Sequence, residues 1–474
     1  MPAIQGRPSV TVSESLMHVA FVVADGADEG KIIDYYYDDE AGWLVQDVTH
    51  RVPGASNAAG TAASITTDAQ WHTLYRATGG GLSHLYYRAG DGWFYDDLAN
   101  LAHARPMAGS ASCAMTPGQL HAFYRDDNRH ISHTYYRDGG WIWEDMAAVV
   151  PGSLRDASGD PAAIYVYDQV HVAYVADDGS LAHFYHENGR GWIRQDMTTP
   201  ANRAPSAKGA AVFLAYGDRL ECFYRDRNDH IARLYFAKGG WQYEDISAAS
   251  QCSSLAAGDP AAIGYDDRPR IVFRDSTGHV IELTGTSKGD QWSCSDLSKA
   301  SSAPNAASDP ALGIYASQLH VFFAAVDGHI HDIYGEGAVS DQDLDVLAKR
   351  PIPIGKMSLH NEGDYLVTMR FNYLKSSGQQ RQSPATTGFP FRIGTTSTAD
   401  PGDFRVNPGD ELWIDISAYL GHSAQGHQHF IYSPGDARIA RYHCSGATLD
   451  VKLVYDGIRG GATVTDASDI AATA

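Results

Sequence analysis

The chain has 474 residues, 43% of them hydrophobic, which is enough for two or three domains with sizeable cores. Its formal net charge of −21 at pH 7 disfavours nucleic acid and anionic membrane surfaces as partners. No stretch reaches the roughly 18 apolar residues of a membrane helix, and residues 1–15 lack a signal-peptide pattern, so we expect a cytoplasmic protein or one released without a signal peptide.

A repeat of about 50 residues organises the first three-quarters of the chain. Six tryptophans stand 50, 48, 51, 49 and 51 residues apart: Trp43, Trp93, Trp141, Trp192, Trp241 and Trp292. Each is followed four residues later by an aspartate: Asp47, Asp97, Asp145, Asp196, Asp245 and Asp296. A seventh unit keeps Asp343 but has Val339 in the place of the tryptophan. Seven units therefore run from about residue 8 to residue 345.

Each unit reads as four short strands separated by turn residues. The unit from Asp160 to Met197, for example, contains DPAAIYVY, QVHVAYVA, SLAHFYHE and GWIRQDM. Four strands repeated seven times predict an all-β fold, a seven-bladed β-propeller over residues 1–345. Small residues after Asp160, Asp259 and Asp309 place the first strand at the central channel, so the tryptophan strand is third or fourth from the axis.

Polar side chains on the second and third strands change together. Pairs spaced by twelve residues are His72 with His84, His121 with His133, His171 with His183, Glu221 with Arg233, and Arg270 with Glu282. His320 with His331 is one residue closer, and His18 with Asp34 has a longer loop. We expect the two members to face each other directly across the hairpin. Two pairs have opposite charges, which predicts contact and partial burial, because breaking a buried ion pair costs about 3–5 kcal/mol.

These residues allow two interpretations. The pairs are either cross-strand contacts that lock each hairpin, or groups that bind the hydroxyls of a monosaccharide while a nearby aromatic ring covers its C–H face. The sugar-binding interpretation assigns the five pairs above, His320, His331 and the six repeated tryptophans. The tryptophans also have a structural interpretation, packing between blades with the aspartate bonding a nearby turn. If histidine pairs bind sugar, we expect affinity to fall below about pH 6, where both rings would charge.

At these residues the chain resembles the tandem-repeat propeller lectins, meaning fungal fucose-specific lectins and bacterial seven-bladed lectins, over residues 8–345. The resemblance implies that an Arg opening the second strand and a Glu on the third hold the sugar, and Arg270 with Glu282 match in type, order and spacing. The His–His pairs, the reversed Glu221–Arg233 pair and the missing seventh tryptophan depart from it. It also implies a multivalent lectin for glycans or glycoproteins on cell surfaces, in a defensive or toxin-associated role.

Residues 346–459 predict a second domain, a small β-sandwich of antiparallel strands that include DYLVTMRFNYL, DELWIDISAYL, HQHFIYS and TLDVKLVYDG. It follows a proline-containing linker and would mediate homo-oligomer assembly or deliver a second activity. Residues 460–474 are rich in small residues and predict a disordered tail. His422, His427, His429 and His443 are interpreted as surface histidines without metal, because no Cys or carboxylate stands at a recognisable ligand spacing.

The sequence offers no catalytic signature. GxSxG, HExxH and phosphate-loop motifs are absent, so we predict a non-enzyme without cofactor or metal. A protein-binding scaffold is the alternative, and a propeller enzyme is less favoured. The five cysteines form no CxxC pair; Cys252 and Cys294 fall in one unit and could meet, but reduced thiols are favoured.

Overall fold

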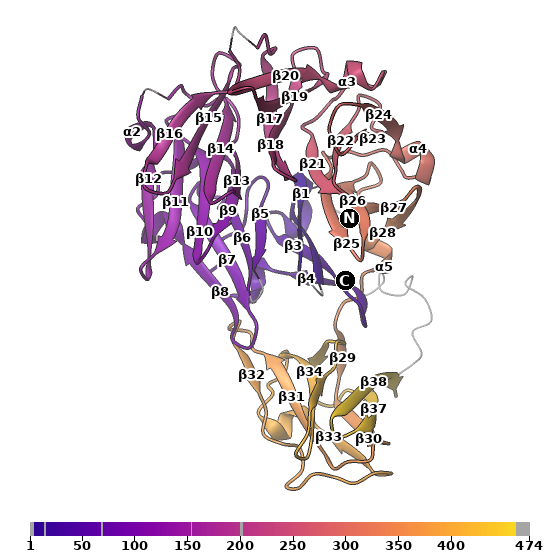
Figure 1. Ribbon diagram of the computed structural model, residues 1–474. Helices are drawn as coiled ribbons and strands as arrows, with labels where there is room; N and C mark the ends of the chain where they lie inside the picture. The colour runs from indigo at the N-terminus through magenta and orange to yellow at the C-terminus, as the bar shows by residue number, and fades with distance from the viewer. Residues whose placement is uncertain (1–3, 14–15, 68–69, 153, 200–201, 461–474) are drawn as a thin grey trace.

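The computed structural model describes residues 4–13, 16–67, 70–152, 154–199 and 202–460. Residues 4–343 of this part form seven four-stranded antiparallel sheets, numbered here sheet 1 to sheet 7, in which the strands follow chain order (Figure 1). Sheets 1 and 2 contain β1 (Ile4–Val12), β2 (Leu16–Val23), β3 (Ile32–Asp38), β4 (Gly42–Asp47), β5 (Ala63–Thr67), β6 (Gln70–Arg76), β7 (Leu82–Arg88) and β8 (Gly92–Asp97). Sheets 3 and 4 contain β9 (Met107–Thr116), β10 (Gln119–Asp126), β11 (Ile131–Arg137), β12 (Gly140–Asp145), β13 (Ala162–Val166), β14 (Gln169–Val175), β15 (Leu181–Glu187) and β16 (Gly191–Asp196). Sheets 5 to 7 contain β17 (Ala207–Tyr216), β18 (Arg219–Asp226), β19 (Ile231–Ala237), β20 (Gly240–Asp245), β21 (Ala261–Tyr265), β22 (Arg268–Arg274), β23 (Val280–Gly285), β24 (Trp292–Asp296), β25 (Ala311–Tyr315), β26 (Gln318–Ala324), β27 (Ile330–Glu336) and β28 (Ala338–Asp343).

The first strands of the sheets surround one cavity. Residues from β1, β5, β9, β13, β17, β21 and β25 line a central space of about 610 Å³. Neighbouring first strands contact one another along the chain, and β25 contacts β1. The predicted all-β fold is confirmed, and the repeated four-stranded sheets fit a β-propeller. The first strand of each unit is the inner one, and the repeated tryptophans lie on the fourth strand.

Short helices follow the fourth strands of five sheets. They are α1 (Leu98–Leu101), α2 (Met146–Val149), α3 (Ile246–Ala249), α4 (Leu297–Ser301) and α5 (Leu344–Leu347). The repeated aspartate before each helix accepts a backbone N–H from its first turn: Asp97, Asp145, Asp245, Asp296 and Asp343. The predicted turn-bonding role of these five aspartates is confirmed. Three 3₁₀ turns are η1 (Gly26–Asp28), η2 (Thr49–Arg51) and η3 (Pro401–Phe404). Among the described residues, no helix has the length and apolar character needed to cross a membrane.

In four sheets, a tyrosine near the end of the second strand hydrogen-bonds to the connection that precedes the sheet. The hydroxyls of Tyr75, Tyr124, Tyr174 and Tyr224 donate to the backbone carbonyls of Ser56, Arg105, Arg155 and Pro205 at 2.9–3.0 Å. All four side chains are fully buried. Each tyrosine therefore contributes both apolar burial and a satisfied hydrogen bond.

The second domain begins with the segment predicted as a linker. One sheet has the strand order β29 (Ile352–Ile354), β36 (Phe430–Tyr432), β34 (Glu411–Ala418), β31 (Val367–Leu374) and β32 (Gln380–Gln382), with β35 (Ser423–Gln425) paired to β34. The other has the order β33 (Thr396–Ala399), β30 (Lys356–Asn361), β37 (Ile439–Ala447) and β38 (Asp450–Arg459). Side chains from both sheets form one hydrophobic core that includes Phe371, Leu412 and Tyr442.

Two expectations for this region are wrong. The strands are not all antiparallel, because β29 pairs with β36 and β30 pairs with β37 in parallel. The proline-containing linker forms a strand, β29, which Pro353 can join because β29 lies at the edge of its sheet. The predicted tail from residue 461 onward lies outside the described residues.

The second domain packs against sheets 1 and 2, beside β4 and β8 (Figure 1). Leu374 and Trp413 belong to a buried cluster that also contains Trp71 and Trp93. Arg51 donates from Nη1 to Oε2 of Glu411 at 2.5 Å. The backbone N–H of Trp93 donates to the carbonyl of Gly378 at 2.8 Å, and that of Gln380 to the carbonyl of Asp91 at 2.9 Å. Apolar burial and backbone hydrogen bonds therefore join the two parts.

Cys252 and Cys294 form a disulfide, so the expectation of reduced thiols is wrong for this pair. Cys252 lies in the connection that enters sheet 6, and Cys294 lies on β24. The bond therefore joins the start of this unit to its outermost strand. The other cysteines, Cys113, Cys222 and Cys444, are free thiols.

Candidate functional site

A row of three polar positions crosses each of the seven sheets. The second-strand position is His18, His72, His121, His171, Glu221, Arg270 or His320, and the third-strand position is Asp34, His84, His133, His183, Arg233, Glu282 or Asp332. Directly opposite the third-strand member, the fourth strand has Gln46, Asp96, Glu144, Gln195, Glu244, Ser295 or Gln342. We call these three positions the polar row. Most of its second- and third-strand members are buried.

The pairing register corrects one expectation. His72 lies opposite Tyr86, and His84 lies opposite Leu74, so the two histidines are diagonal neighbours rather than directly opposed. The same offset recurs in the other sheets, as for Glu221 opposite Tyr235. Diagonal positions on one face of a hairpin are still within reach of long side chains. The predicted contacts between members spaced by twelve therefore form, but across the diagonal.

In sheet 2 the polar row forms a relay that ends in a free nitrogen. His84 Nδ1 is 3.2 Å from Oδ2 of Asp96, and His72 Nδ1 is 3.0 Å from Nε2 of His84. A carboxylate only accepts, so His84 carries its proton on Nδ1 and accepts at Nε2 from Nδ1–H of His72. Nε2 of His72 is left as an acceptor, and no described residue bonds it.

The other two histidine pairs offer no accessible free nitrogen. In sheet 3, His121 and His133 are 2.9 Å apart, and Nε2 of His121 is 3.1 Å from Oγ1 of Thr116. In sheet 4, His171 and His183 are 3.1 Å apart, but Nε2 of His171 is buried without a partner. The three pairs are similar in sequence but differ in what they offer a ligand.

Burial keeps the histidine pairs neutral. It lowers the pKa of His72 to about 3, and the nearby His84 contributes to this shift. Burial likewise lowers the pKa of His121 to about 3 and that of His171 to about 4. A ring with so low a pKa is uncharged at pH 5 to 6. The expectation that these pairs charge below about pH 6 is therefore wrong, because it took the histidine pKa as unshifted.

The charged pair of sheet 5 has its hydrogen-bonding groups occupied by other protein groups; we call such a pair closed. Arg233 donates to both carboxylate oxygens of Glu221, to Glu244 at 2.8 Å and to the carbonyl of Gly289 from the next sheet at 2.7 Å. Glu221 is 0% and Arg233 is 3% exposed. Glu221 also accepts the hydroxyl of Tyr216 at 3.0 Å. Protein groups therefore take up the hydrogen-bonding capacity that a sugar would need.

In sheet 6, Arg270 donates from Nη1 to Oε1 of Glu282 at 2.9 Å, so the pair that matches the resemblance is in contact. Its Arg side chain retains 19% exposure, more than that of Arg233. The neighbouring sheet supplies Val339 where the other units have tryptophan. This pair therefore lacks the tryptophan, although the Arg270 guanidinium lies 5.6 Å from the ring centre of Tyr265.

In sheet 7 the predicted pairing of His320 with His331 is wrong. His320 Nδ1 is 2.8 Å from Oδ2 of Asp332, twelve residues on, and Gln342 also bonds Asp332. His331 is one residue earlier on β27 and bonds Asp327 and Asp341 instead. Successive side chains on a strand point to opposite faces, so the shift of one residue separates His331 from His320.

Several repeated tryptophans cover the polar row of the preceding sheet. Trp141 lies edge-on to His84 with ring centres 5.3 Å apart, and its Nε1 donates to Oδ2 of Asp96 at 3.2 Å. Trp241 donates in the same way to Gln195 at 3.0 Å. Further edge-on contacts join Trp192 to His133 and Trp43 to Phe322, whereas Trp93 contacts Trp71 and Trp292 covers Arg233. The predicted packing of tryptophans between sheets is confirmed.

A cleft of about 860 Å³ opens between sheets 2 and 3. His72, Tyr86 and Arg88 line one side, and Tyr136 and Trp141 line the other. Tyr136 is 41% exposed and contacts Trp141 edge-on at 5.4 Å. No described residue bonds the hydroxyl of Tyr86 or the free nitrogen of His72. The cleft thus combines an aromatic wall with free hydrogen-bonding groups and is the candidate site.

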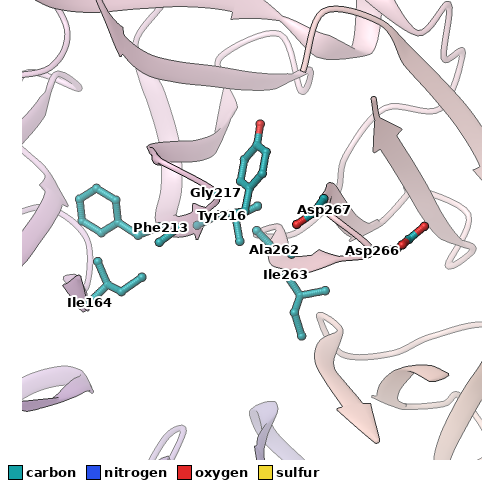
Figure 2. Close-up of a pocket in the computed structure, with 11 residues that line it drawn as sticks. Ile164, Phe213, Tyr216, Gly217, Ala262, Ile263, Asp266 and Asp267 are labelled. Atoms are coloured by element: carbon teal, nitrogen blue, oxygen red, sulfur yellow. The ribbon is translucent and has the colours of Figure 1, made fainter. Parts of the chain in front are cut away.

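A second cavity lies at the inner ends of sheets 4 to 6 (Figure 2). It has a volume of about 570 Å³ and is lined by Ile164, Phe213 and Ile263, with Asp266 and Asp267 on a turn beside it. Figure 2 shows Phe213 on one side of Tyr216 and Asp266 on the other, with Tyr216 pointing away from Ile263. None of the predicted sugar-binding residues lines this cavity, so we assign it no part in the site.

Three of the four histidines considered for metal binding have carboxylate partners. His427 bonds Asp38 at 2.7 Å, His429 bonds Glu411 at 2.6 Å and His443 bonds Asp456 at 2.7 Å. Among the residues that the structure describes, His329, Asp343 and Asp345 bring three ligand atoms within 4.8 Å of one another. Asp343 caps α5, and Asp345 accepts from Tyr35 and from the backbone of Ile330. These bonds account for the group without an ion.

Sequence reasoning missed two members of the site. The tyrosine opposite the second-strand position recurs in six units as Tyr36, Tyr86, Tyr135, Tyr185, Tyr235 and Tyr334. The fourth-strand polar residue recurs three positions after all six repeated tryptophans, as Asp96 does after Trp93. Both signals are visible as fixed offsets in the repeat. Which row ends in a free nitrogen depends on contacts that no offset reveals.

No protein-family model matches the chain, and no curated protein sequence is significantly similar to it. Solved structures similar to it include the BP39L lectin of Burkholderia pseudomallei, with 14% identity, a TM-score of 0.49 and coverage of 71% of this chain and 98% of that one. AofleA from Arthrobotrys oligospora has 13% identity and a TM-score of 0.41, covering 72% of this chain and 96% of its own. The fungal lectin of Aleuria aurantia has 14% identity and a TM-score of 0.41, covering 59% and 93%. Propeller lectins, which the sequence resembles, are thus also among the solved structures similar to this chain.

Proposed function

We propose that the chain is a lectin whose seven sheets are the blades of a closed propeller, with a β-sandwich as its second domain. The cleft between sheets 2 and 3 carries this proposal. There, Trp141 and Tyr136 provide an aromatic surface for the C–H face of a sugar, and His72 Nε2 and the hydroxyl of Tyr86 reach its hydroxyls. A hydroxyl both donates and accepts, so one monosaccharide residue matches both free groups.

The sugar in this proposal is neutral. The chain carries a formal charge of −21, Asp96 lies within the cleft, and Arg88, which also lines it, lies 3.4 Å from Oδ2 of Asp91, so a carboxylated or sulfated sugar is disfavoured. Fucose-like sugars belong to the neutral class, and the cleft would distinguish among them by the placement of hydroxyls around the aromatic wall.

In this proposal the protein has fewer than seven equivalent sugar sites. The Glu221–Arg233 row is closed by protein groups, whereas rows that end in a free nitrogen remain available. Two or more weak sites still give strong attachment to a surface on which glycans are suitably spaced.

The Cys252–Cys294 disulfide supports a released protein that recognises glycans in defence or on a host cell, because disulfides persist mainly outside the cytosol. Assembly through the second domain would add further valency.

A glycan array on the intact chain tests the function, and Tyr86→Phe tests the site. The Tyr86 hydroxyl bonds no described residue, so its removal should leave stability unchanged and weaken binding about fivefold. Tyr185→Phe is the matched control, because Tyr185 occupies the same position beside the His171–His183 pair, whose free nitrogen is buried. Binding of peptides rather than any glycan would favour a protein-binding scaffold and remove the lectin proposal.

A further inference from the structure

The cleft between sheets 1 and 2 differs from the candidate site because the second domain covers it. Its cavity has a volume of about 390 Å³, within the size range of small-molecule sites. His18, Tyr36 and Trp71 line it from the ring, while Trp413 and His429 line it from β34 and the segment before β36. The cavity is therefore built by two domains.

The walls of this cavity are rich in aromatic rings. The ring centres of His18 and Trp71 are 5.6 Å apart, and Trp71 meets Trp93 edge-on at 5.6 Å. From the second domain, Trp413 stacks on His429 with ring centres 4.6 Å apart and planes within 7°. A ligand with an apolar face would be enclosed by rings from both domains.

Three accessible hydrogen-bonding atoms on these walls have no partner among the described residues. His18 Nδ1 faces Asp34 at 2.8 Å and His429 Nδ1 faces Glu411 at 2.6 Å, so each ring carries its proton on Nδ1 and presents Nε2 as an acceptor. The hydroxyl of Tyr36 makes no hydrogen bond. Trp413 is 4% exposed, and its indole N–H is buried without a partner, so this residue offers a ligand its ring and not a hydrogen bond. Two ring nitrogens and one hydroxyl on one cavity match the hydroxyl groups of a ligand, which both donate and accept.

The charges around the cavity exclude an anion. Although burial alone would raise the pKa of Glu411, Arg51 and His429 hold it at about 2, so this carboxylate is ionised. Asp38 lines the same cavity and bonds His427 at 2.7 Å. Arg51 is already committed to Glu411 and to Gln46. An anionic ligand would therefore meet carboxylates without a free cation to bind it.

We propose that this junction is a second type of sugar site, which takes one neutral monosaccharide residue between the two domains. The proposal rests on the lectin function above and adds to it a site that neither domain forms alone. A sugar held there contacts His18 and Tyr36 on one side and Trp413 and His429 on the other. Binding would then favour the docked arrangement of the two domains, since the ligand contacts both.

The test uses the full chain labelled with 5-fluorotryptophan and titrated with methyl glycosides of neutral monosaccharides. The ¹⁹F resonances of Trp413 and Trp141 are assigned with Trp413→Phe and Trp141→Phe, so one spectrum reports both clefts. We expect a saturable shift of the Trp413 resonance. Tyr36→Phe should weaken that titration about fivefold, without changing the melting temperature or the response of Trp141.

The outcomes separate this site from the general function. If a glycoside shifts Trp141 but leaves Trp413 unchanged, the junction site is wrong and the lectin proposal stands. If no glycoside shifts either resonance, both proposals fail. If Trp413 shifts equally in the wild type and in Tyr36→Phe, a remote effect on the domain contact is responsible, and the junction site is overturned.

Discussion

Sheets 2 and 5 carry different side chains at the same three positions of the repeat. In sheet 2, the relay from Asp96 through His84 ends at a free nitrogen of His72, in a cleft of about 860 Å³. In sheet 5, Arg233 bonds Glu221, Glu244 and a carbonyl of the next sheet, and both members of the pair are buried. A position in the repeat therefore does not define a site. What matters is whether the protein has already used the hydrogen bonds of the side chains placed there.

Arg233→Met should give the largest difference in effect between sheet 5 and sheet 2. It leaves Glu221 buried with the Tyr216 hydroxyl as its remaining bond, which should cost about 3–5 kcal/mol in free energy of unfolding. Sugar affinity at sheet 2 should not change. Chemical denaturation and glycoside titration measure the two quantities.

A double variant controls this prediction. Glu221→Gln combined with Arg233→Met removes the buried charge, so most of the lost stability should return. A single variant as stable as the wild type would mean that the pair is not closed, and would remove the contrast between the sheets.

Trp141→Ala should act on affinity as well as on the packing between sheets 2 and 3. It removes the aromatic wall of the sheet 2 cleft, and we expect binding about tenfold weaker, equal to about 1.4 kcal/mol. Trp292→Ala is the matched change beside sheet 5, where the ring lies 5.6 Å from the Arg233 guanidinium. It should lower the melting temperature and leave glycoside affinity unchanged. Equal affinity losses in both variants would contradict the contrast.

The repeat made much of the architecture predictable. A fixed spacing of Trp43, Trp93 and their successors requires one structural unit repeated along the chain, and the twelve-residue pairs meet because they flank one hairpin. Counting residues across a hairpin was less reliable in sheet 7, where both His331 and Asp332 are polar and only the register selects Asp332. Successive side chains of a strand point to opposite faces. Residue type alone therefore cannot tell which of two adjacent polar residues lies on the face of the polar row.

The junction with the second domain was not predictable from the sequence. Trp413 lies more than 300 residues from Trp71, in a segment without the repeat, and no spacing connects them. The histidine pKa values were also missed, since burial and a neighbouring ring set them. Both depend on contacts between segments that are far apart in the sequence. The repeat predicts contacts only within one unit.

The pH dependence of stability should differ between sheet 4, which contains the His171–His183 pair, and sheet 5, which contains the Glu221–Arg233 pair. Burial lowers the pKa of His171 to about 4, so the folded chain keeps this ring neutral while the unfolded chain takes up a proton below about pH 6.5. Stability contributed by the neutral ring is therefore present above pH 6.5 and lost as the pH falls toward 4. For one such histidine the loss between pH 7 and pH 5 is about 2 kcal/mol.

His171→Gln should reduce that pH-dependent loss, as measured by urea denaturation at pH 7 and pH 5. The double variant Glu221→Gln with Arg233→Met leaves no ionisable group at this pair, so it should shift the unfolding free energy equally at both pH values. Glycoside affinity at sheet 2 should be flat between pH 8 and pH 5, because the pKa of His72 lies near 3. An affinity midpoint near pH 6 would contradict the buried, neutral relay.

The smallest expected effects come from the helix caps. Asp97 accepts the backbone N–H of Asn100 at 3.2 Å and its side-chain amide at 2.6 Å, and the helix it caps carries Leu101, which lines the sheet 2 cleft. Asp97→Ala should cost about 1 kcal/mol of stability and weaken glycoside binding about twofold, because the edge of the cleft loosens. Asp245→Ala removes the equivalent cap beside sheet 5 and should cost the same stability without changing affinity. If both substitutions weakened binding alike, the caps would act on the whole ring rather than on the nearest cleft.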